Sequence, residues 1–507
     1  MAAVAGAKTL CGIAGLNRAF ASASPAELAA DPRRPQYHLL PAVNWMNDPN
    51  GPIYWQGQYH MFYQYNPNGA YWGDMHWGHA VSPDMIHWRH LPVALSPTPG
   101  GPDAGGCFSG TALSDGSGRV AMLYTGVVPA PENQATIRDG VHSLRESQCL
   151  AFGAGADLTA WAKDDMPVIA NPPEGLDVTG FRDPVPWKHR DAWLMAVGSG
   201  LRGKGGAVLL YRSTDLHHWQ YLHLFAGGSG GGDQTPNPVD SGDMWECPDF
   251  FPLGGKHVLI HSTQGKAFWQ SGSFDTDALV FHAERGGVLD SGSFYAPKTQ
   301  LDRAQNRILW GWIPESRPEA EYRASGWAGL MSLPRVLTLD SSGDLRIETA
   351  AQVEKLRKTE RKLNLTADED KNRRLLAEFR LEDCCGEIAC SFQKGAQPTE
   401  ISLVSEQTMD QPWLTCRFDP SRPTEMQIDG KTVSVGSTGN GQIQLRFFVD
   451  GSVIECFANS AAPLTKRFYY AGANAPALRV NVTAGWKNLS SLSLWQFSPI
   501  SSDRLTT

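Results

Sequence analysis

The sequence contains no dense run of lysine or arginine, no apolar run long enough to span a bilayer, and no paired Cys-x-x-Cys motif. Its 44 basic residues are outnumbered by 52 acidic ones, which gives a net charge of −8. This balance offers no attraction to nucleic acid or anionic lipid, so neither is expected as a partner. Because the sequence has no Cys-x-x-Cys pair, it lacks the usual zinc and redox motifs, and no metal and no cofactor are expected. A neutral, sugar-like ligand fits the composition better.

What the chain does contain points to strands and turns. It has 507 residues with 52 Gly, 34 Pro and 17 Trp, while charged residues make up only 19%. Glycine and proline terminate strands in turns, and tryptophan favours pleated, half-buried surfaces. The length exceeds that of one ordinary core, so a large domain with a smaller one is expected. The composition therefore predicts an all-β protein.

Cysteine and the amino terminus bear on the cellular compartment. Nine cysteines is an odd number, so at least one thiol is free. Five of them crowd the last quarter, and both disulfides and buried free thiols fit the sequence there: Cys384, Cys385, Cys390, Cys416 and Cys456.

Residues 1–23 are rich in Ala and Gly, lack acidic groups and end in "AFASA", which is similar to a signal-peptidase site. We expect residues 1–35 to be a signal or a disordered terminus. The protein is expected to be secreted or periplasmic, with a cytoplasmic location as the alternative, and the sequence leaves its oligomeric state open.

An internal repeat organises the first two thirds of the chain. An Asp followed four residues later by an aromatic residue recurs at spacings of 73, 58 and 62, in Asp84/Trp88, Asp157/Trp161, Asp215/Trp219 and Asp277/Phe281. Each copy lies between short apolar or alternating runs that read as strands. We interpret the units as propeller blades, in which the Asp caps a turn and the aromatic residue fills the space between neighbouring sheets.

The repeat and its absence define the expected domains. Residues 36–345 have room for five units and are predicted to form a five-bladed β-propeller. Residues 346–364 are expected to be a partly helical linker, because 351–364 is charged and has no Gly or Pro. Alternating runs broken by Asp450-Gly451 follow, so residues 365–507 are predicted to form a β-sandwich.

Three acidic residues differ from the others in their surroundings. Asp48 in "WMNDPNG", Asp183 in "GFRDPVPW" and Glu246 in "MWECPDFFP" each lie among aromatic residues and prolines. The proline after Asp48 and after Asp183 favours extended backbone and removes a ladder donor, as suits an edge strand. Acidic residues are usually solvated, but Asp48, Ser109, Asp183 and Glu246 are spaced by 61, 74 and 63, near the repeat period. The same face of successive blades is thus predicted to bring together Asp48, Phe108, Ser109, Arg182, Asp183, Glu246 and Tyr295.

Carboxylates on opposite walls of a pocket can cleave a glycosidic bond. One attacks or activates water and the other protonates the leaving oxygen, through a transition state that resembles an oxocarbenium ion. The amides around Asp48 are expected to hold it ionised, and Arg182 is expected to do the same for Asp183. Glu246 lies between Trp245 and Cys247, so we expect apolar surroundings that favour its protonated, acid form.

These motifs resemble those of glycoside hydrolase family 32, the family of invertases, levanases, inulinases and fructan exohydrolases. The resemblance rests on "WMNDPNG", "FRDP" and "WECPDFFP", with support from "FYQYNP", "WGHAVS", "CFSG", "ILWGWIPE" and "GWAGLMSLPR". It implies a five-bladed propeller with a carboxy-terminal sandwich, which hydrolyses terminal β-D-fructofuranosyl residues of sucrose or fructans with retention. By motif, Asp48 resembles the nucleophile, Asp183 the transition-state stabiliser and Glu246 the acid/base. The resemblance further implies a fructose subsite lined by Asn47, Gln64, Trp72, Phe108, Ser109 and Arg182.

Two departures from the family pattern bear on substrate preference. Asp74 stands where relatives commonly have a neutral residue, and Ala267-Phe268 stands where plant sucrose-cleaving relatives tend to have Asp and an aromatic residue. If such positions contact the leaving group, the lost carboxylate reduces hydrogen bonding to glucose and favours fructan ends.

Alternatives with the same motifs remain open. An inverting, arabinanase-like five-bladed glycosidase would use the same fold and three acids. A fructosyltransferase would pass the fructosyl group from the same intermediate to a sugar hydroxyl. A sugar-binding propeller without activity would use tryptophan as a stacking platform, although most tryptophans are better interpreted as core.

Overall fold

The computed structural model describes residues 23–138, 140, 142–227, 242–366, 368–408, 410–435 and 441–501. Nearly all regular structure in these residues is strand, which confirms the expected all-β class. The α-helices are short and are α1 (Pro25–Ala30), α2 (Glu319–Ser325) and α3 (Glu369–Ala377). Short 3-10 helices are formed by Ala351–Leu356, Glu382–Cys384 and Trp486–Asn488.

Five sheets follow one another along residues 44–349, and we call them the five-sheet unit. The first sheet has the order β20 (Trp327–Ala328), β1 (Asn44–Trp55), β2 (Gln58–Asn66), β3 (His76–Ser82) and β4 (Arg89–Leu95). The second has β5 (Gly106–Ser114), β6 (Val120–Pro129), β8 (Ser143–Gly153) and β7 (Ile137–Arg138), with β9 (Trp161–Lys163) also on β8. The third has β10 (Val178–His189), β11 (Ala192–Leu201), β12 (Gly205–Ser213) and β13 (Gln220–Gly227).

The remaining two sheets complete this unit. The fourth has β14 (Glu246–Leu253), β15 (Lys256–Thr263), β16 (Lys266–Asp275) and β17 (Val280–Val288). The fifth has β18 (Tyr295–Leu301), β19 (Arg307–Ile313), β22 (Arg335–Leu339) and β23 (Leu345–Thr349), with β21 (Leu330–Met331) also on β19. Most pairs are antiparallel hairpins, but β20 joins β1 in parallel, so a late segment completes the first sheet.

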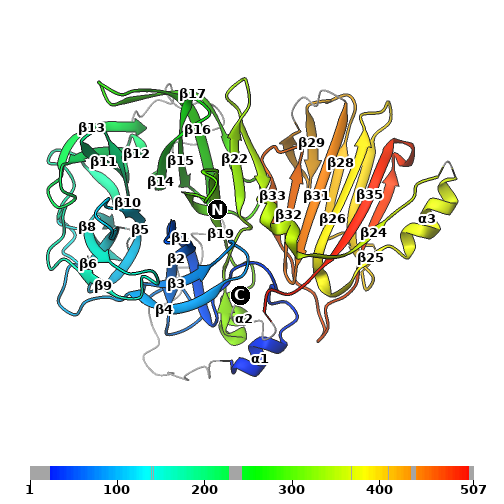
Figure 1. The fold of residues 1–507 in the computed structure, drawn as a ribbon, viewed down its shortest axis with the longest axis horizontal. Helices are drawn as coiled ribbons and strands as arrows, with labels where there is room; N and C mark the ends of the chain where they lie inside the picture. Colours follow the sequence, from blue (N-terminus) through cyan, green and yellow to red (C-terminus); the bar gives the residue numbers. More distant parts are fainter. Residues whose placement is uncertain are drawn as a thin grey trace.

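The first strands of the five sheets form a closed cycle of contacts. β1 packs against β5, β5 against β10, β10 against β14, β14 against β18, and β18 against β1. In Figure 1 the labelled strands β1, β5, β10 and β14 gather around the middle of the left-hand half. Side chains at equivalent places on five distant segments are therefore neighbours in space.

Hydrophobic clusters between adjacent sheets account for the repeated aromatic residues. Trp88 packs where the fifth sheet meets the first, Trp161 between the first and second, and Phe281 between the third and fourth. Asp84 Oδ1 accepts from the amides of Ile86 and His87 at 3.1 and 2.9 Å, as a turn cap should. In the last copy Asp275, two residues before the expected Asp277, caps the turn.

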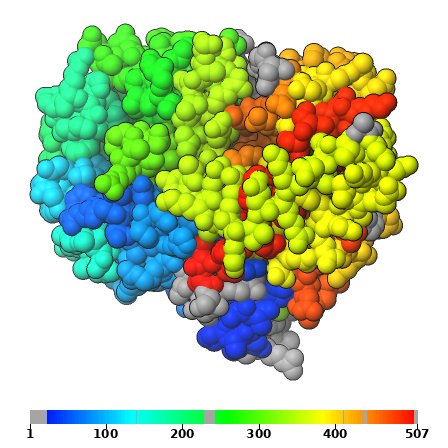
Figure 2. Space-filling model, turned by 45° about the vertical axis from the view of Figure 1, so that its right-hand side comes forward, coloured from blue at the N-terminus to red at the C-terminus, as the bar shows by residue number. Residues whose placement is uncertain are grey.

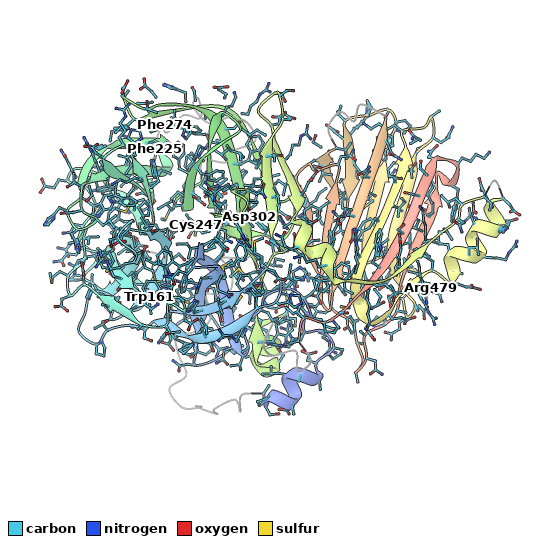
Figure 3. The ribbon with its side chains drawn as sticks, in the orientation of Figure 1. Trp161, Phe225, Cys247, Phe274, Asp302 and Arg479 are labelled. Carbon is cyan, nitrogen blue, oxygen red and sulfur yellow. The ribbon has the colours of Figure 1, made fainter. Side chains whose placement is uncertain are left out.

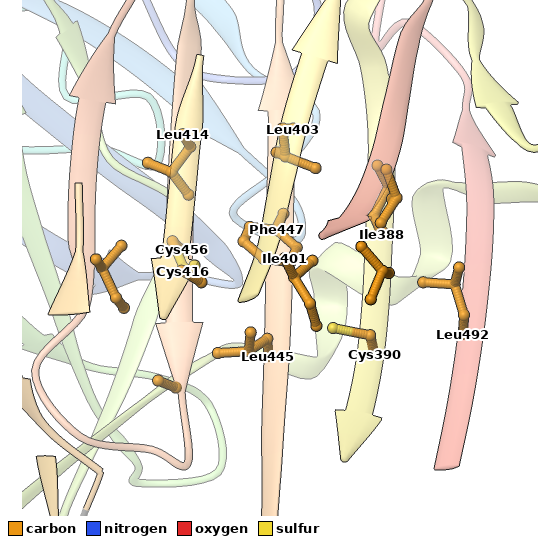
Figure 4. Packing of buried hydrophobic residues seen from close by; sticks show 14 of the residues in the cluster. Ile388, Cys390, Ile401, Leu403, Leu414, Cys416, Leu445, Phe447, Cys456 and Leu492 are labelled. Carbon is orange, nitrogen blue, oxygen red and sulfur yellow. The ribbon is translucent and has the colours of Figure 1, made fainter. Parts of the chain in front are cut away.

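Two six-stranded sheets follow and form the two-sheet unit. One has the order β24 (Arg357–Lys362), β35 (Leu489–Phe497), β26 (Cys385–Gln393), β31 (Gln442–Asp450), β32 (Val453–Ala458) and β33 (Leu464–Arg467). The other has β25 (Arg380–Leu381), β34 (Leu478–Ala484), β27 (Thr399–Ser405), β28 (Leu414–Phe418), β29 (Glu425–Ile428) and β30 (Lys431–Ser434). Their inner faces share one apolar core, in which Cys416 and Cys456 face each other at 4.0 Å between the sulfur atoms (Figure 4). The eight cysteines that the structure describes are buried free thiols, and Cys11 lies outside the described residues.

The helical prediction for 351–364 is wrong beyond residue 356. Only Ala351–Leu356 is helical, as a short 3-10 helix, and the chain then continues as β24 along the edge of β35. Arg357 explains the change, because its Nε donates to Glu387 at 2.8 Å and its guanidinium lies 4.1 Å from the centre of the Trp495 ring. Strand pairing and these tertiary contacts outweigh the local helix propensity.

A buried charged network joins the two units. His38, which precedes β1, contacts Asp450 through Nδ1 at 2.8 Å and Glu455 through Nε2 at 3.0 Å. Arg335 of β22 contacts the same Glu455 at 2.6 Å, and all four side chains are fully buried. Figure 2 shows the yellow-green segment around residue 350 lying across the junction of the two units. The carboxylates of the two-sheet unit thus hold both the start and the end of the five-sheet unit.

Candidate active site

Each of the five first strands is interrupted by a break in register at the same place. The breaks fall between Met46 and Pro49, Phe108 and Gly110, Arg182 and Val185, Glu246 and Asp249, and Tyr295 and Lys298. Four of them contain or end at a proline, whose missing N–H cannot join the ladder. A β-bulge leaves a residue unpaired and redirects its side chain. The repeated bulge therefore aims residues of five strands at one place.

The backbone of Asp183 differs from the extended conformation expected from the sequence. The following proline predicts extended backbone, but Asp183 has φ of 65°, and Cys247 and Ala296 at the matching positions have φ of 47° and 50°. Left-handed backbone costs free energy for residues other than glycine and persists where tertiary contacts enforce it. Asp183 is thus held by a bulge and not by a regular edge strand.

A pocket of about 600 Å³ opens above these bulges. All the residues predicted for the site line it: Asn47, Asp48, Gln64, Trp72, Phe108, Ser109, Arg182, Asp183, Glu246 and Tyr295. The lining also includes Ile137, His142, Leu144, Asp243 and Gln264. Figure 3 places Cys247, another lining residue, near the middle of the five-sheet unit, with Trp161 farther out.

Asp48 of β1 is held by donors on three sides. Ser109 Oγ donates to its Oδ2 at 2.7 Å, Asn47 Nδ2 donates to Oδ1 at 3.0 Å, and the Cys247 sulfur lies 3.5 Å from Oδ2. Burial raises the pKa of Asp48, the bonds from Ser109 and Asn47 oppose this, and the nearby Glu246 raises it further. The expected amide donor is present, but its effect on the pKa is smaller than that of burial.

Asp183 of β10 is held by hydrogen bonds to groups on two other strands. Its Oδ2 accepts from the backbone amide of Cys247 at 2.7 Å, while its own amide donates to Thr125 Oγ1 at 2.9 Å. Burial raises the pKa of Asp183 to about 6, and Arg182 and Lys298 only partly counter it. The expected effect of Arg182 in favour of the ionised form is therefore present, but it is smaller than the opposing effect of burial.

Glu246 begins β14 and has polar partners instead of the expected apolar surroundings. Arg182 Nη2 donates to its Oε1 at 2.7 Å, and the Tyr295 hydroxyl donates to its Oε2. The indole of Trp245 points away into the core and stacks on His261 at 3.8 Å between ring centroids. The prediction of apolar surroundings for Glu246, which was made from its neighbours in the sequence, is therefore wrong.

Two residues of the site were missed. Cys247 contacts both aspartates, and a signal existed, because it precedes a proline in "WECP" as Asp48 and Asp183 do in "NDP" and "RDP". Glu146 of β8 is fully buried and binds Arg182 Nη1 at 2.8 Å. No motif marks Glu146, because its role depends on which strand faces β10.

The two positions suspected of contacting a leaving group lie elsewhere. Ala267 and Phe268 are buried in β16, each about 1% exposed, and are not among the lining residues. Asp74 is bonded to Asn68 and Tyr71 and is also absent from the lining. The hairpin before Ala267 instead contributes Thr263, Gln264 and Gly265 to the pocket. The inference of a fructan preference from these positions therefore loses its basis.

No group of three or more His, Cys, Asp or Glu in the described part of the chain is arranged to hold a metal ion. Within the same residues, no helix is both long enough and apolar enough to cross a membrane.

Comparison with known proteins agrees with the motifs. Residues 38–349 match the model of the glycosyl hydrolases family 32 N-terminal domain, and residues 352–496 match that of the family 32 C-terminal domain. The chain is 32% identical over 490 residues to sucrose-6-phosphate hydrolase of Escherichia coli, covering 91% of this chain and 94% of that protein.

Solved structures with the same arrangement support the match. A Bombyx mori GH32 beta-fructofuranosidase is 28% identical, with a TM-score of 0.74 over 94% of this chain and 96% of that one. Fructan 1-exohydrolase IIa from Cichorium intybus is 26% identical, with a TM-score of 0.73 over 92% and 98%. The chain therefore belongs to glycosyl hydrolase family 32 and is a glycoside hydrolase.

Proposed function

We propose that this protein is a retaining β-fructofuranosidase, which releases terminal β-D-fructofuranosyl residues from sucrose or fructans through a fructosyl-enzyme intermediate. The observation that carries the proposal is the convergence of Asp48, Asp183 and Glu246 in one pocket, with each carboxylate held by donors from another strand. Two carboxyl groups that act on opposite sides of a glycosidic bond are the requirement for this chemistry.

In the first step Asp48 attacks the anomeric carbon of the fructosyl ring. Its carboxylate is oriented by Ser109 and Asn47, so little rearrangement is needed before attack. Glu246 gives its proton to the glycosidic oxygen, and the bond from that oxygen to the anomeric carbon breaks as the bond to Asp48 forms. The leaving sugar departs as a neutral alcohol.

In the second step Glu246, now a carboxylate, takes a proton from water, which attacks the same carbon and releases Asp48. Asp183 lies beside this centre and, when ionised, stabilises the positive charge that develops on the ring in both steps. Two displacements at one carbon leave its configuration unchanged.

Relatives support the substrate class. A mutant of the Bombyx mori enzyme has been solved in complex with sucrose, and a mutant of the Cichorium intybus enzyme in complex with 1-kestose. The pocket of this chain, of about 600 Å³, has room for such small saccharides.

Product analysis tests the proposal. Purified protein should release fructose from sucrose, levan or inulin, and proton NMR of the first product formed should show the β anomer of fructofuranose. An inverted anomer would point to the inverting glycosidase, and fructosyl-sucrose products at high sucrose would reveal transfer. Absence of turnover together with tight sugar binding would support the non-catalytic alternative.

We further propose that the five sheets are the blades of a five-bladed β-propeller and that the two six-stranded sheets form a β-sandwich, with the domain boundary within residues 346–364. The closed cycle of first strands and the apolar clusters between successive sheets support a propeller. Limited proteolysis should cut first between the two domains if the boundary is correct.

Export is proposed on the amino-terminal sequence, of which residues 1–22 lie outside the described residues. A relative from Zea mays named as a cell wall isozyme supports export, whereas the Escherichia coli relative carries no such name. The mass of the mature protein from its natural host would show whether the first residues are removed.

A further inference from the structure

Behind the pocket lies a carboxylate that faces no substrate. Glu146 of β8 is fully buried, and its oxygens accept from Arg182 Nη1 at 2.8 Å, from the Phe181 amide at 2.7 Å and from Thr136 Oγ1 at 2.8 Å. All three groups can donate, and a carboxylate can accept from all of them at once. Glu146 thus places a fully buried carboxylate behind the pocket.

Arg182 connects this charge to the pocket. Its Nη1 binds Glu146, while its Nη2 binds Oε1 of Glu246 at 2.7 Å. The planar guanidinium therefore lies between two carboxylates and presents a different nitrogen to each. Any change in the charge of Glu146 alters how strongly Arg182 attracts Glu246.

We propose that Glu146 is a positioning residue for the glycosidase reaction, which acts through Arg182 to keep Glu246 able to hold the proton it must donate. The inference rests on the proposed function, in which Glu246 is the acid/base. An arginine beside an acid catalyst favours the ionised form and so opposes proton donation. Glu146 offsets this by engaging the same guanidinium, and it also fixes the direction in which Nη2 points.

The other groups around Glu246 do not fill this role. Tyr295 of β18 donates to Oε2, Asp48 of β1 adds a negative charge, and Asp183 lies next to Arg182 on β10. Lys298 of β18 acts on Asp183 and donates to the Pro248 carbonyl at 2.9 Å. The hydrogen bonds that the Arg182 guanidinium donates within this group go to Glu146 and to Glu246 itself.

The main test is the pH dependence of kcat/KM for E146Q, which removes the charge with little change in shape. Arg182 would then act on Glu246 alone, so the alkaline limb should move to lower pH by roughly 0.5–1 unit.

Two control variants accompany this test. E146D keeps the charge and should leave that limb near its wild-type position. E387Q is the matched control, because Glu387 is also buried and binds two arginines, Arg357 and Arg446, far from the pocket. If E146Q and E387Q lower thermal stability alike and both leave the limb in place, Glu146 is only structural and the proposal fails.

A second test does not depend on activity. Carbon-13 NMR of glutamate labelled at the carboxyl carbon would follow the titration of Glu246, assigned by its loss in E246Q. The signal should titrate at lower pH in E146Q than in wild type, and the same substitution should add no shift in an R182M background. An equal shift with and without Arg182 would overturn the route through the guanidinium. E146Q alone could fail to fold because it removes a buried partner of Arg182. In that case E146Q/R182M, which removes both members of the Glu146–Arg182 pair, avoids the unpaired charge. A protein that shows these titrations without cleaving fructosides would refute the proposed function and not the coupling.

Discussion

The backbone amide of Cys247 donates a 2.7 Å hydrogen bond to the carboxylate of Asp183. The thiol of the same residue lies 3.5 Å from Asp48 Oδ2. One residue of β14 thus touches acids from β1 and β10, through its side chain and its backbone respectively. Its substitution should affect the two acids differently.

Cys247→Ala should weaken catalysis without abolishing it. The amide bond to Asp183 remains, while Asp48 loses one of its three contacts, worth about 1 kcal/mol. We expect kcat for sucrose to fall about fivefold with KM nearly unchanged. Steady-state kinetics measures this, with Cys390→Ala in the other unit as a control. A large rise in KM with constant kcat would contradict this assignment.

Asp48→Asn and Glu246→Gln should each lower kcat by several orders of magnitude. The first removes the attacking carboxylate and the second the proton donor, but both keep the size of the side chain. Released fructose measures turnover, and thermal unfolding checks that the fold is intact. Near-normal turnover in either folded variant would refute the roles given to these residues.

Asp183 couples activity and stability to pH in opposite directions. Its pKa is raised to about 6 by burial, so the proton is lost and catalytic charge is gained as pH rises through 6. Wild-type kcat/KM should therefore fall below about pH 6. The folded state binds this proton more tightly than the unfolded state, so the free energy of unfolding contributed here decreases from about pH 4 to 6.

Asp183→Asn should separate the two effects. Activity should drop by about a thousandfold, because the ring charge loses its partner. At pH 7 the free energy of unfolding of the variant should exceed that of the wild type by up to roughly 3 kcal/mol, because a buried charge is removed. Urea unfolding at pH 4 and 7 measures this, and a variant that is equally destabilised at both pH values would contradict it.

His38 should make the junction of the two units sensitive to alkaline pH. Burial acts to lower its pKa, but hydrogen bonds to Asp450 and Glu455 outweigh this and leave the pKa raised. The stability this gives is fully present below the ordinary histidine pKa of about 6.5 and is lost as pH rises through the raised value. His38→Gln should reduce the free energy of unfolding by about 3–5 kcal/mol at pH 6 and by less at pH 9. Urea unfolding at both pH values tests this prediction. An equal loss of free energy of unfolding at pH 6 and pH 9 would refute the assignment of a charged His38.

The pocket should discriminate against phosphorylated sugars. Its described lining contains the carboxylates of Asp48, Asp183, Asp243 and Glu246, whereas Arg182 is the one arginine or lysine among them and is bound to two glutamates. We expect kcat/KM for sucrose to exceed that for sucrose 6-phosphate at least tenfold, because like charges repel in a partly desolvated site. Asp243→Asn should narrow the gap, and Asp277→Asn, on a distant turn, should not. Equal or faster cleavage of the phosphorylated sugar would contradict the expectation.

The sequence predicted which residues meet but not how they are held. Asp48, Asp183 and Glu246 were identifiable because each lies one or two residues before a proline at a regular spacing, and such local signals mark bulges. Burial around Asp183 and the partners of Glu246 were misjudged, because both depend on strands 49 to 64 residues away along the chain. The helical prediction for Arg357–Lys362 fails for the same reason, since the partner strand β35 lies near the end of the chain.

The parallel pairing of β20 with β1 has a consequence for the order of events during synthesis. Residues 327 and 328 complete the sheet that contains Asp48, and Gly329 lies so close to Met46 that a Cβ there would meet its carbonyl oxygen at 1.9 Å. A nascent chain that has not yet extended past this point has Asp48, the proposed nucleophile, in a sheet with an open edge. Ribosome-bound chains truncated before residue 327 should thus be inactive, and activity should appear only once the closing segment has left the exit tunnel.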